Sequence, residues 1–319
     1  MQIIHIHHPF DPQQIKVDDV VLAMGFFDGV HRGHQAVIKR AKKIANNKNL
    51  PLAVLTYDHH PAIVYQSSEQ PLTYLSPLTR KLALMKQLDV DIVYVVSFTS
   101  ALSALTPQEF VNQYIVGFHA TVAVAGFDHT YGPKQVATMA NLPKYAQGRF
   151  EVETVTPELQ NGEKISSTKI RALLDRGAIE QANQLFNYQY QTSGIIVHGE
   201  ARGRELGFPT ANIQWPTDER MPSVGVYVVM LKIGEQWLRG MASIGYNITF
   251  GNQRPKTLEI YLLDFDQAIY GENVQVKWIK RLRNEIKYTT AADLVEQLKQ
   301  DEIDTRRTFA TVTNSPNLQ

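Results

Sequence analysis

Two histidines three residues apart lie in a glycine-rich segment, Gly25-Phe26-Phe27-Asp28-Gly29-Val30-His31-Arg32-Gly33-His34. The segment follows an apolar run, VVLAM at 20–24, and precedes a helical pattern. The N-terminus of a helix exposes unpaired N–H groups and the positive end of its dipole, so it binds phosphate. The ring N–H groups of His31 and His34 could donate to phosphate oxygens whose charge grows during phosphoryl or nucleotidyl transfer. The pattern predicts a phosphate-binding turn, and the alternative is a glycine-rich turn with two incidental histidines.

A second phosphate-binding helix start is predicted at Ile165–Arg171. Three hydroxyl side chains, Ser166, Ser167 and Thr168, open this helix, and Arg171 follows one turn later. The arginine could pair with a triphosphate. Taken alone, the segment also fits an ordinary capped helix.

A third constellation lies in the second half of the chain, where a predicted strand enters a basic, glycine-rich loop. Arg202 and Arg204 alternate with the glycines of this loop, Gly199, Gly203 and Gly207, and Pro209-Thr210-Ala211-Asn212 follow. The G-K-[S/T] ending of a P-loop is missing. Thr210 and Asn212 point the same way on an extended chain, and two neutral oxygens plus nucleotide phosphates suit Mg²⁺.

Glu259 is the candidate general base of this second half. It alternates with Leu258 and Ile260, so it projects from the opposite face of a predicted strand. A carboxylate there could take a proton from an attacking hydroxyl. The alternative is a solvated carboxylate on a strand.

The elements that position the first two constellations alternate between strand and helix. Buried strands are predicted at 20–24, 52–57, 91–96 and 121–126, with helices after Gly33, from Pro77 and after the N-cap candidate Thr106. This alternation is typical of a parallel sheet covered on both faces, which binds ligands at the carboxyl ends of its strands.

The second half is punctuated differently, by turn residues between short β-type runs. GIIVHG, GVYVVMLKI, TLEIYLLDF and NVQVKWIKRL predict strands of an antiparallel barrel or sandwich, followed by a helix over 291–300. A helical stretch at 167–186 precedes them. We therefore expect an α/β N-terminal domain at 1–186 and a β-barrel domain at 187–319.

Composition excludes several classes of protein. The 319 residues have a formal net charge of +1, which gives no reason to expect nucleic acid or a membrane as partner. No cysteine is present, so disulfides and thiolate sites are excluded. No apolar run approaches the ~20 residues of a membrane span, and MQIIHIHHPFDP is not a secretory signal. A cytoplasmic protein is expected, and weak self-association stays open. We interpret three histidines near the start, His5, His7 and His8, as surface residues of a first strand.

The segment GFFDGVHRGH resembles the H-x-G-H signature of the nucleotidyltransferase superfamily, which has a Rossmann-like fold. It is more similar still to the form in the adenylyltransferase module of bacterial riboflavin kinase/FAD synthetases. His60-Pro61 matches the end of that family's F-x-P-H-P segment, and the Ile165–Arg171 segment resembles its I-S-S-T-x-I-R. His59, His129 and Tyr131 depart from the pattern, standing where the family has proline and two phenylalanines. The last two departures fall on the flavin or adenine pocket.

The loop and Pro-Thr-Ala-Asn segment strongly resembles G-R-x-L-G-x-P-T-A-N of the riboflavin kinase module of the same enzymes. Later matches follow in order at 222–227, 244–251, 258–265, 270–271 and 282–285. Ile248 departs, standing where the family usually has proline.

The resemblance implies two sets of site residues. For the adenylyltransferase, the ATP-binding residues would be Gly25, Phe26, Asp28, Gly29, His31, Gly33, His34, Ser166, Ser167, Thr168 and Arg171, and the flavin-binding residues His60 and Asp128. For the kinase, the ATP-binding residues would be Gly199, Gly203, Arg204, Gly207, Pro209, Thr210 and Asn212, the metal ligands Thr210 and Asn212, and the flavin-binding residues Glu259 and Arg283. The implied catalytic residues are His31, His34, Arg171 and Glu259.

The implied function is bifunctional, with ATP as co-substrate and Mg²⁺ as cofactor. The C-terminal module would phosphorylate riboflavin to FMN, and the N-terminal module would adenylylate FMN to FAD with release of pyrophosphate. The alternatives are loss of one activity, a flavin- or nucleotide-sensing regulator on the same folds, and a binding protein with inactive sites.

Overall fold

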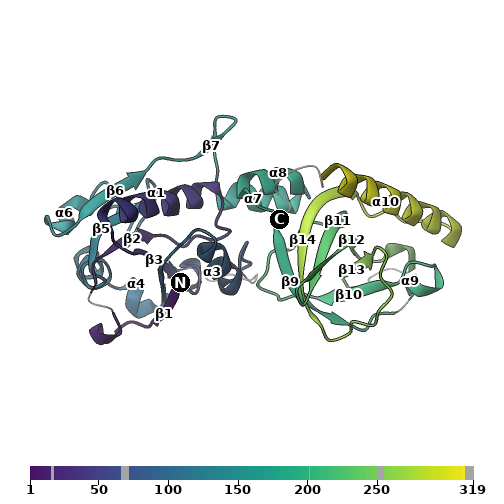
Figure 1. The fold of residues 1–319 in the computed structure, drawn as a ribbon, viewed down its shortest axis with the longest axis horizontal. Coiled ribbons are helices and arrows are strands. Elements are labelled where there is room, and N and C mark those ends of the chain that lie inside the picture. Colours follow the sequence, from purple (N-terminus) through teal and green to yellow (C-terminus); the bar gives the residue numbers. More distant parts are fainter. Residues whose placement is uncertain (16–17, 66–71, 201, 251–254, 313–319) are drawn as a thin grey trace. The chain divides into compact units, whose positions relative to one another are not determined.

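The computed structural model describes residues 1–15, 18–65, 72–200, 202–250 and 255–312. The chain divides into two compact units, Met1–Ser167 and Thr168–Gln319 (Figure 1). Gly251 and the C-terminal tail at 313–319 lie outside the described residues.

The N-terminal unit is built on a six-stranded parallel sheet of order β1-β4-β3-β2-β5-β6. Its strands are β1 (Gln2–Ile6), β2 (Val20–Met24), β3 (Leu52–Tyr57), β4 (Ile92–Val96), β5 (Ala120–Gly126) and β6 (Glu151–Val155). The chain runs outward from β2 through β3 to β4 on one side, and from β5 to β6 on the other. The carboxyl ends of β2 and β5 therefore flank the topological switch point, where open α/β sheets bind ligands. The parallel sheet predicted from the sequence is confirmed.

Helices and a small hairpin connect these strands. They are α1 (Arg32–Lys48), α2 (Ala62–Tyr65), α3 (Leu78–Lys86), α4 (Ser100–Ser103), α5 (Pro107–Phe110), a π-helical continuation (Val111–Val116) and α6 (Leu142–Ala146), with β7 (Leu159–Gln160) paired to β8 (Glu163–Lys164) and a short 3₁₀ turn at Pro12–Gln14. Thr106 caps α5 as expected, in a capping box with Glu109.

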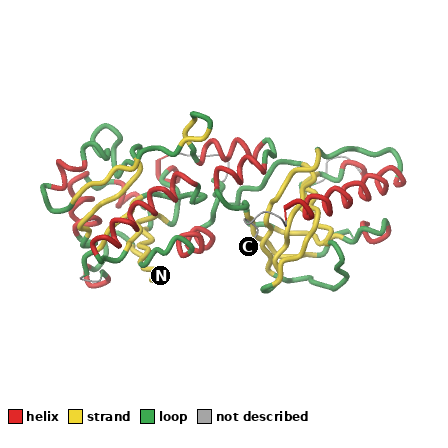
Figure 2. Tube along the Cα trace, turned by 45° about the horizontal axis from the view of Figure 1, so that its top comes forward, coloured by secondary structure: helices red, strands yellow, loops and turns green. Residues whose placement is uncertain are grey.

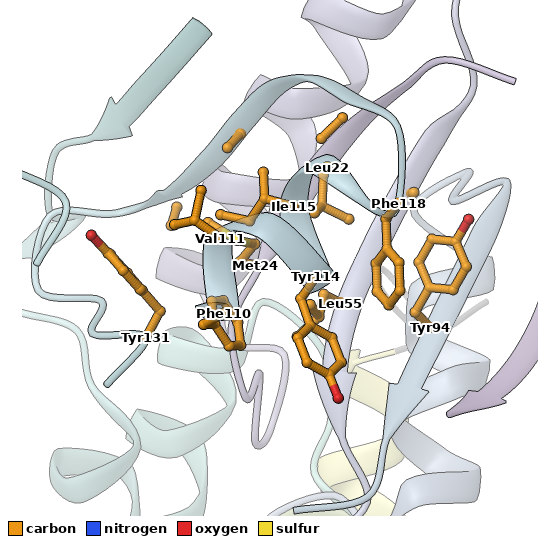
Figure 3. Packing of buried hydrophobic residues seen from close by; sticks show 14 of the residues in the cluster. Leu22, Met24, Leu55, Tyr94, Phe110, Val111, Tyr114, Ile115, Phe118 and Tyr131 are labelled. Carbon is orange, nitrogen blue, oxygen red and sulfur yellow. The ribbon is translucent and has the colours of Figure 1, made fainter. Parts of the chain in front are cut away.

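Hydrophobic residues bury both faces of the sheet. On one face, Leu22 and Met24 belong to an aromatic-rich core with Phe110, Tyr114 and Phe118 (Figure 3). On the other face α1 packs against β2, β3 and β5. Its buried residues include Val37, Ile38 and Ala41. This packing fixes the position of α1 and therefore of the loop that leads into it.

The second unit contains a closed antiparallel barrel of order β10-β13-β12-β11-β14-β9. Its strands are β9 (Gln191–Val197), β10 (Thr210–Gln214), β11 (Gly225–Ile233), β12 (Gln236–Gly245), β13 (Thr257–Leu262) and β14 (Asn273–Arg283). β9 pairs with both β10 and β14, which closes the ring. Of the two architectures the sequence left open, the barrel is the one observed. A helical turn, α9 (Arg202–Glu205), lies within the glycine-rich loop, and a 3₁₀ turn covers Ile248–Phe250.

The helical stretch predicted at 167–186 is two helices, α7 (Ser167–Asp175) and α8 (Ile179–Phe186). Gly177, with a φ of 73°, breaks it. Asn183 of α8 donates to the carbonyl oxygen of Trp278 on β14 at 2.9 Å, which ties α8 to the barrel. The compact units thus divide before these helices, whereas the sequence placed the boundary after them; the domain limits of 1–186 and 187–319 stay a prediction.

The last helix, α10 (Ala291–Val312), extends well past the end predicted at Gln300. Its buried stripe continues as Asp301, Thr305 and Phe309, at spacings of four. Two of these residues are polar, so the apolar pattern in the sequence stops early. Figure 2 shows α10 as a long helix beside the barrel strands.

Candidate active sites

The loop after β2 has an unusual backbone. Phe27 and Val30 have φ angles of 57° and 37°, and Gly29 has a φ of 82°. A left-handed conformation is costly for a β-branched residue such as Val30, and such strain persists only where the surrounding structure imposes it. A Cβ atom on Gly25 would lie 2.9 Å from the Phe27 ring, so no larger residue fits there without a shift.

His31 and His34 stack at the start of α1, with ring centroids 3.6 Å apart and an interplanar angle of 20°. His31 is the N-cap residue, and its Nδ1 accepts from the His34 backbone N–H at 3.4 Å. An accepting Nδ1 leaves the proton of a neutral ring on Nε2. Burial, and secondarily the neighbouring His31, holds the pKa of His34 well below its usual value. The His34 ring can thus donate to phosphate as a neutral group.

Asp28 anchors this loop to a segment that the sequence analysis did not assign. Only 3% exposed, its carboxylate accepts from the backbone N–H groups of Leu75 and Ser76, both at 3.0 Å. The Gly29 N–H donates to the Ser76 hydroxyl at 2.7 Å. A direct contact of Asp28 with ATP stays a prediction.

The I-S-S-T segment meets the same loop. The Ser167 hydroxyl donates to the carbonyl oxygen of Asp28 at 3.1 Å. The carbonyl oxygen of Ile165 lies 3.7 Å from where a Cβ on Gly33 would be. Thr168 and Arg171 are on α7 and belong to the second compact unit.

The two predicted flavin-binding residues follow β3 and β5. The ring of His60 lies edge-on to Phe26, with centroids 4.9 Å apart, and its Nδ1 accepts from the Ala62 N–H at 3.1 Å. Asp128 forms an ion pair with Lys164 of β8. Both lie at the carboxyl ends of strands, and their contact with flavin stays a prediction.

Of the two departures that follow β5, Tyr131 is buried and His129 is half-buried. Tyr131 is 6% exposed and stacks on Phe110 in the hydrophobic core, with centroids 5.8 Å apart. Burial lowers the pKa of His129 to about 4, although Asp128 opposes the shift. These substitutions are accommodated by packing beside the site. His59 is exposed.

A cavity of about 670 Å³ lies beside the barrel and is lined by residues of β10, β12, β13 and α10 and of the loops around them. Thr210, Asn212 and Glu259 all line it. Glu259 accepts from Asn247 Nδ2 at 2.7 Å on one carboxylate oxygen, and from the Thr210 hydroxyl at 3.2 Å on the other. Its carboxylate is thereby held in one orientation inside the cavity.

Two glycines of the glycine-rich loop are packed closely against the residues around them. A Cβ on Gly199 would meet the Asn212 amide at 2.1 Å, and one on Gly203 would meet the Phe208 carbonyl oxygen at 2.3 Å. Both glycines line the cavity, whereas Arg204, Gly207 and Pro209 are not among its lining residues. Their assignment to ATP stays a prediction. Of the two arginines in this loop, Arg202 lines the cavity.

Arg283 lines the cavity but already has a strong partner. Its guanidinium donates to both carboxylate oxygens of Asp301 on α10, with the shortest N–O distance 2.6 Å. This pair joins β14 to α10, so any contact of Arg283 with flavin would be made from a fixed side chain.

The sequence analysis missed three residues at these sites. Asn247, with a φ of 53°, is held by Glu285, whose carboxylate accepts from the N–H groups of Tyr246 and Asn247 at 2.9 Å. Ser76 and Lys81 support the loop after β2. Only Lys81 left a signal in the sequence, as a charged residue on the apolar face that also carries Leu84 and Met85.

No cluster of three or more His, Cys, Asp or Glu side chains among the described residues could hold a metal ion. None of the helices in the described part of the chain is long and apolar enough to cross a membrane.

A parallel sheet with a histidine-bearing phosphate loop, and a closed barrel with a carboxylate cavity, define a two-domain nucleotide-using transferase. Residues 13–169 match the family model of FAD synthetase, and residues 186–309 match that of riboflavin kinase. The chain is 48% identical to the bifunctional riboflavin kinase/FMN adenylyltransferase of Listeria monocytogenes, over 97% of this chain and 99% of that protein. It is 39% identical to the protein of the same name from Bacillus subtilis, over the same shares.

A solved structure described as a macrolide-efflux protein from Streptococcus pneumoniae has a TM-score of 0.87 and 38% identity, covering 95% of this chain and 99% of that one. The chain belongs to the bifunctional riboflavin kinase/FMN adenylyltransferase family. It combines the two enzyme domains of flavin cofactor biosynthesis, as its motifs predicted.

Proposed function

We propose that the barrel phosphorylates riboflavin to FMN and that the parallel-sheet domain adenylylates FMN to FAD, both from ATP. The observation that best supports this is the placement of Glu259, an oriented carboxylate inside a cavity of about 670 Å³. That volume lies within the range of small-molecule sites. We place this chemistry in the cytoplasm.

In the kinase reaction, Glu259 accepts the proton of the terminal ribityl hydroxyl as that oxygen attacks the γ-phosphate. Asn247 and Thr210 fix both oxygens of the carboxylate, so its orientation is set before substrate enters. Leu294 and Leu298 of α10 line the cavity and form an apolar wall on which the flavin ring packs.

The residues in the cavity also fit Mg²⁺. The Thr210 hydroxyl donates a hydrogen bond to Glu259, which leaves the lone pairs of its oxygen for a cation, and the Asn212 amide is packed tightly against Gly199. Mg²⁺ takes few protein ligands and completes its shell with phosphate oxygens and water. When bound, it would neutralise charge on the transferring phosphate.

In the adenylyltransferase reaction, the FMN phosphate attacks the α-phosphate of ATP and pyrophosphate leaves. His31 and His34 donate to oxygens on which charge develops, and Arg171 pairs with the triphosphate. No covalent enzyme intermediate is needed, because positioning and charge neutralisation suffice.

A pair of single variants tests this division of labour. Glu259→Gln should lower FMN formation by about 10²–10⁴-fold, the usual contribution of a general base, and spare FAD formation from added FMN. His34→Ala should do the reverse. Glu235→Gln, an exposed carboxylate at the turn after β11, is the matched control and should change neither rate. Equal loss of both activities in either site variant would contradict the two-site assignment.

A further inference from the structure

One buried cation lies beneath the phosphate loop and is not used by the proposed chemistry. Lys81 of α3 is 2% exposed. Its Nζ donates to the carbonyl oxygen of Phe26 at 3.1 Å and to that of Tyr57 at 2.8 Å. It also lies 4.3 Å from the centroid of the Phe26 ring. A buried ammonium without such partners would be strongly unfavourable, so these contacts fix its position.

The two carbonyl groups belong to the two motif loops of the adenylyltransferase site. Phe26 is in the loop after β2 that leads to His31 and His34, and Tyr57 ends β3 just before His60. Lys81 therefore ties together the carboxyl ends of two neighbouring strands, at the edge where the sheet binds its ligand.

The strained backbone of the first loop needs such support. Phe27 and Val30 have left-handed φ angles, which the surrounding contacts must enforce. Lys81 holds the loop at Phe26, while Ser76, just before α3, holds it at Gly29 through its hydroxyl. One contact is made by α3 and the other by the segment that leads into it.

We infer that Lys81 is a positioning residue of the adenylyltransferase site, which holds the strained loop so that His31 and His34 meet the phosphates of ATP. The inference rests on the proposed function of this domain. It assigns α3 a role that lies outside the sequence motifs and outside the residues proposed to contact ATP or flavin.

The ionisation of Lys81 supplies a readout that packing alone would not. Burial lowers the pKa of Lys81 to about 8, against the opposing charges of Asp28 and Asp58. The other titratable groups around it are Tyr57, whose pKa burial raises, and the neutral His34. Above pH 8 the ammonium charge is lost, and with it the strength of the two contacts to carbonyl groups.

The test measures FAD formation from FMN and ATP by the full chain, between pH 6.5 and 9.5. Lys81→Met should lower kcat/KM about 10–100-fold, and it should lack the decline that we expect of the unaltered chain near pH 8. Lys86→Met, which removes an exposed lysine at the end of the same helix, is the control and should leave rate and pH profile unchanged.

Ser76→Ala loosens the same loop without removing a buried charge, so it serves if Lys81→Met does not fold. It should lower the rate about 3–10-fold. The inference is overturned if folded Lys81→Met keeps the parental rate and the decline near pH 8, or if Ser76→Ala has the parental rate. Failure of the unaltered chain to form FAD would instead overturn the proposed function.

Discussion

Burial determines the chemistry of single side chains at both sites. His34 keeps a neutral ring because burial lowers its pKa, so it donates a hydrogen bond without adding a charge. Glu259 is held by Asn247 and Thr210, so the proposal that it is the base rests on its geometry rather than on its exposure. At this scale the sequence showed the residue types, whereas their partners became visible only in the fold.

The pH dependence of stability should reveal the half-buried His129. Its pKa of about 4 lies below that of an unfolded histidine, so the unfolded chain binds the proton first. His129 therefore favours the folded state fully above pH 6.5, and this contribution is lost as pH falls towards 4. Between pH 8 and pH 5 the unaltered chain should lose about 1–2 kcal/mol relative to His129→Phe.

Thermal unfolding of both proteins at the two pH values measures this difference. His59→Phe, at an exposed position, is the control. The difference in stability between this variant and the unaltered chain should be the same at both pH values. A constant difference between the unaltered chain and His129→Phe would show that folding does not lower the pKa of His129.

Helix α10 matters at the scale of elements, because it walls the kinase cavity and is fastened by one buried ion pair. The side chains of Arg283 and Asp301 are 17% and 3% exposed. Removing one member of a buried pair leaves the other charge uncompensated. Asp301→Asn should therefore destabilise the barrel by about 3 kcal/mol and weaken riboflavin binding.

Asp304→Asn is the matched control on the same helix, since Asp304 pairs only with the exposed Arg307 among the ion pairs of the described residues. Denaturant unfolding and riboflavin titration measure the two effects. Equal behaviour of the two variants would show that the ion pair does not hold α10 in place.

The elements that could be predicted from the sequence are those with a clear period. Val20–Met24 and Leu52–Tyr57 were predicted with the observed bounds, because an unbroken apolar run indicates a buried parallel strand. The end of α10 was missed because Asp301 and Thr305 continue its buried stripe with polar side chains. Ser76 and Lys81 were missed as site residues because their role depends on contacts with loops about 20 to 55 residues away.

At the scale of the whole molecule, the residues proposed for the two reactions are divided between the two compact units. Glu259, Thr210 and Asn212 lie in the second unit, and His31 and His34 in the first. We predict that FMN is released from the kinase site and reaches the adenylyltransferase site by diffusion. A mixture of Glu259→Gln and His34→Ala proteins should convert riboflavin to FAD, although neither protein does so alone.

Flavin chromatography of the mixture and of each variant measures this complementation. FAD should form after a lag in which FMN accumulates. FMN accumulation without any FAD, from variants that each keep their other activity, would show that both working sites must lie on one chain.

The central claim is that one chain makes FAD from riboflavin in two steps. The measurement that tests it most directly is chromatography of the flavins after the purified protein is incubated with riboflavin, ATP and Mg²⁺. We predict that FMN appears first and FAD follows. If FAD never appears, even when FMN is supplied, the N-terminal domain is not a working adenylyltransferase and the account is contradicted.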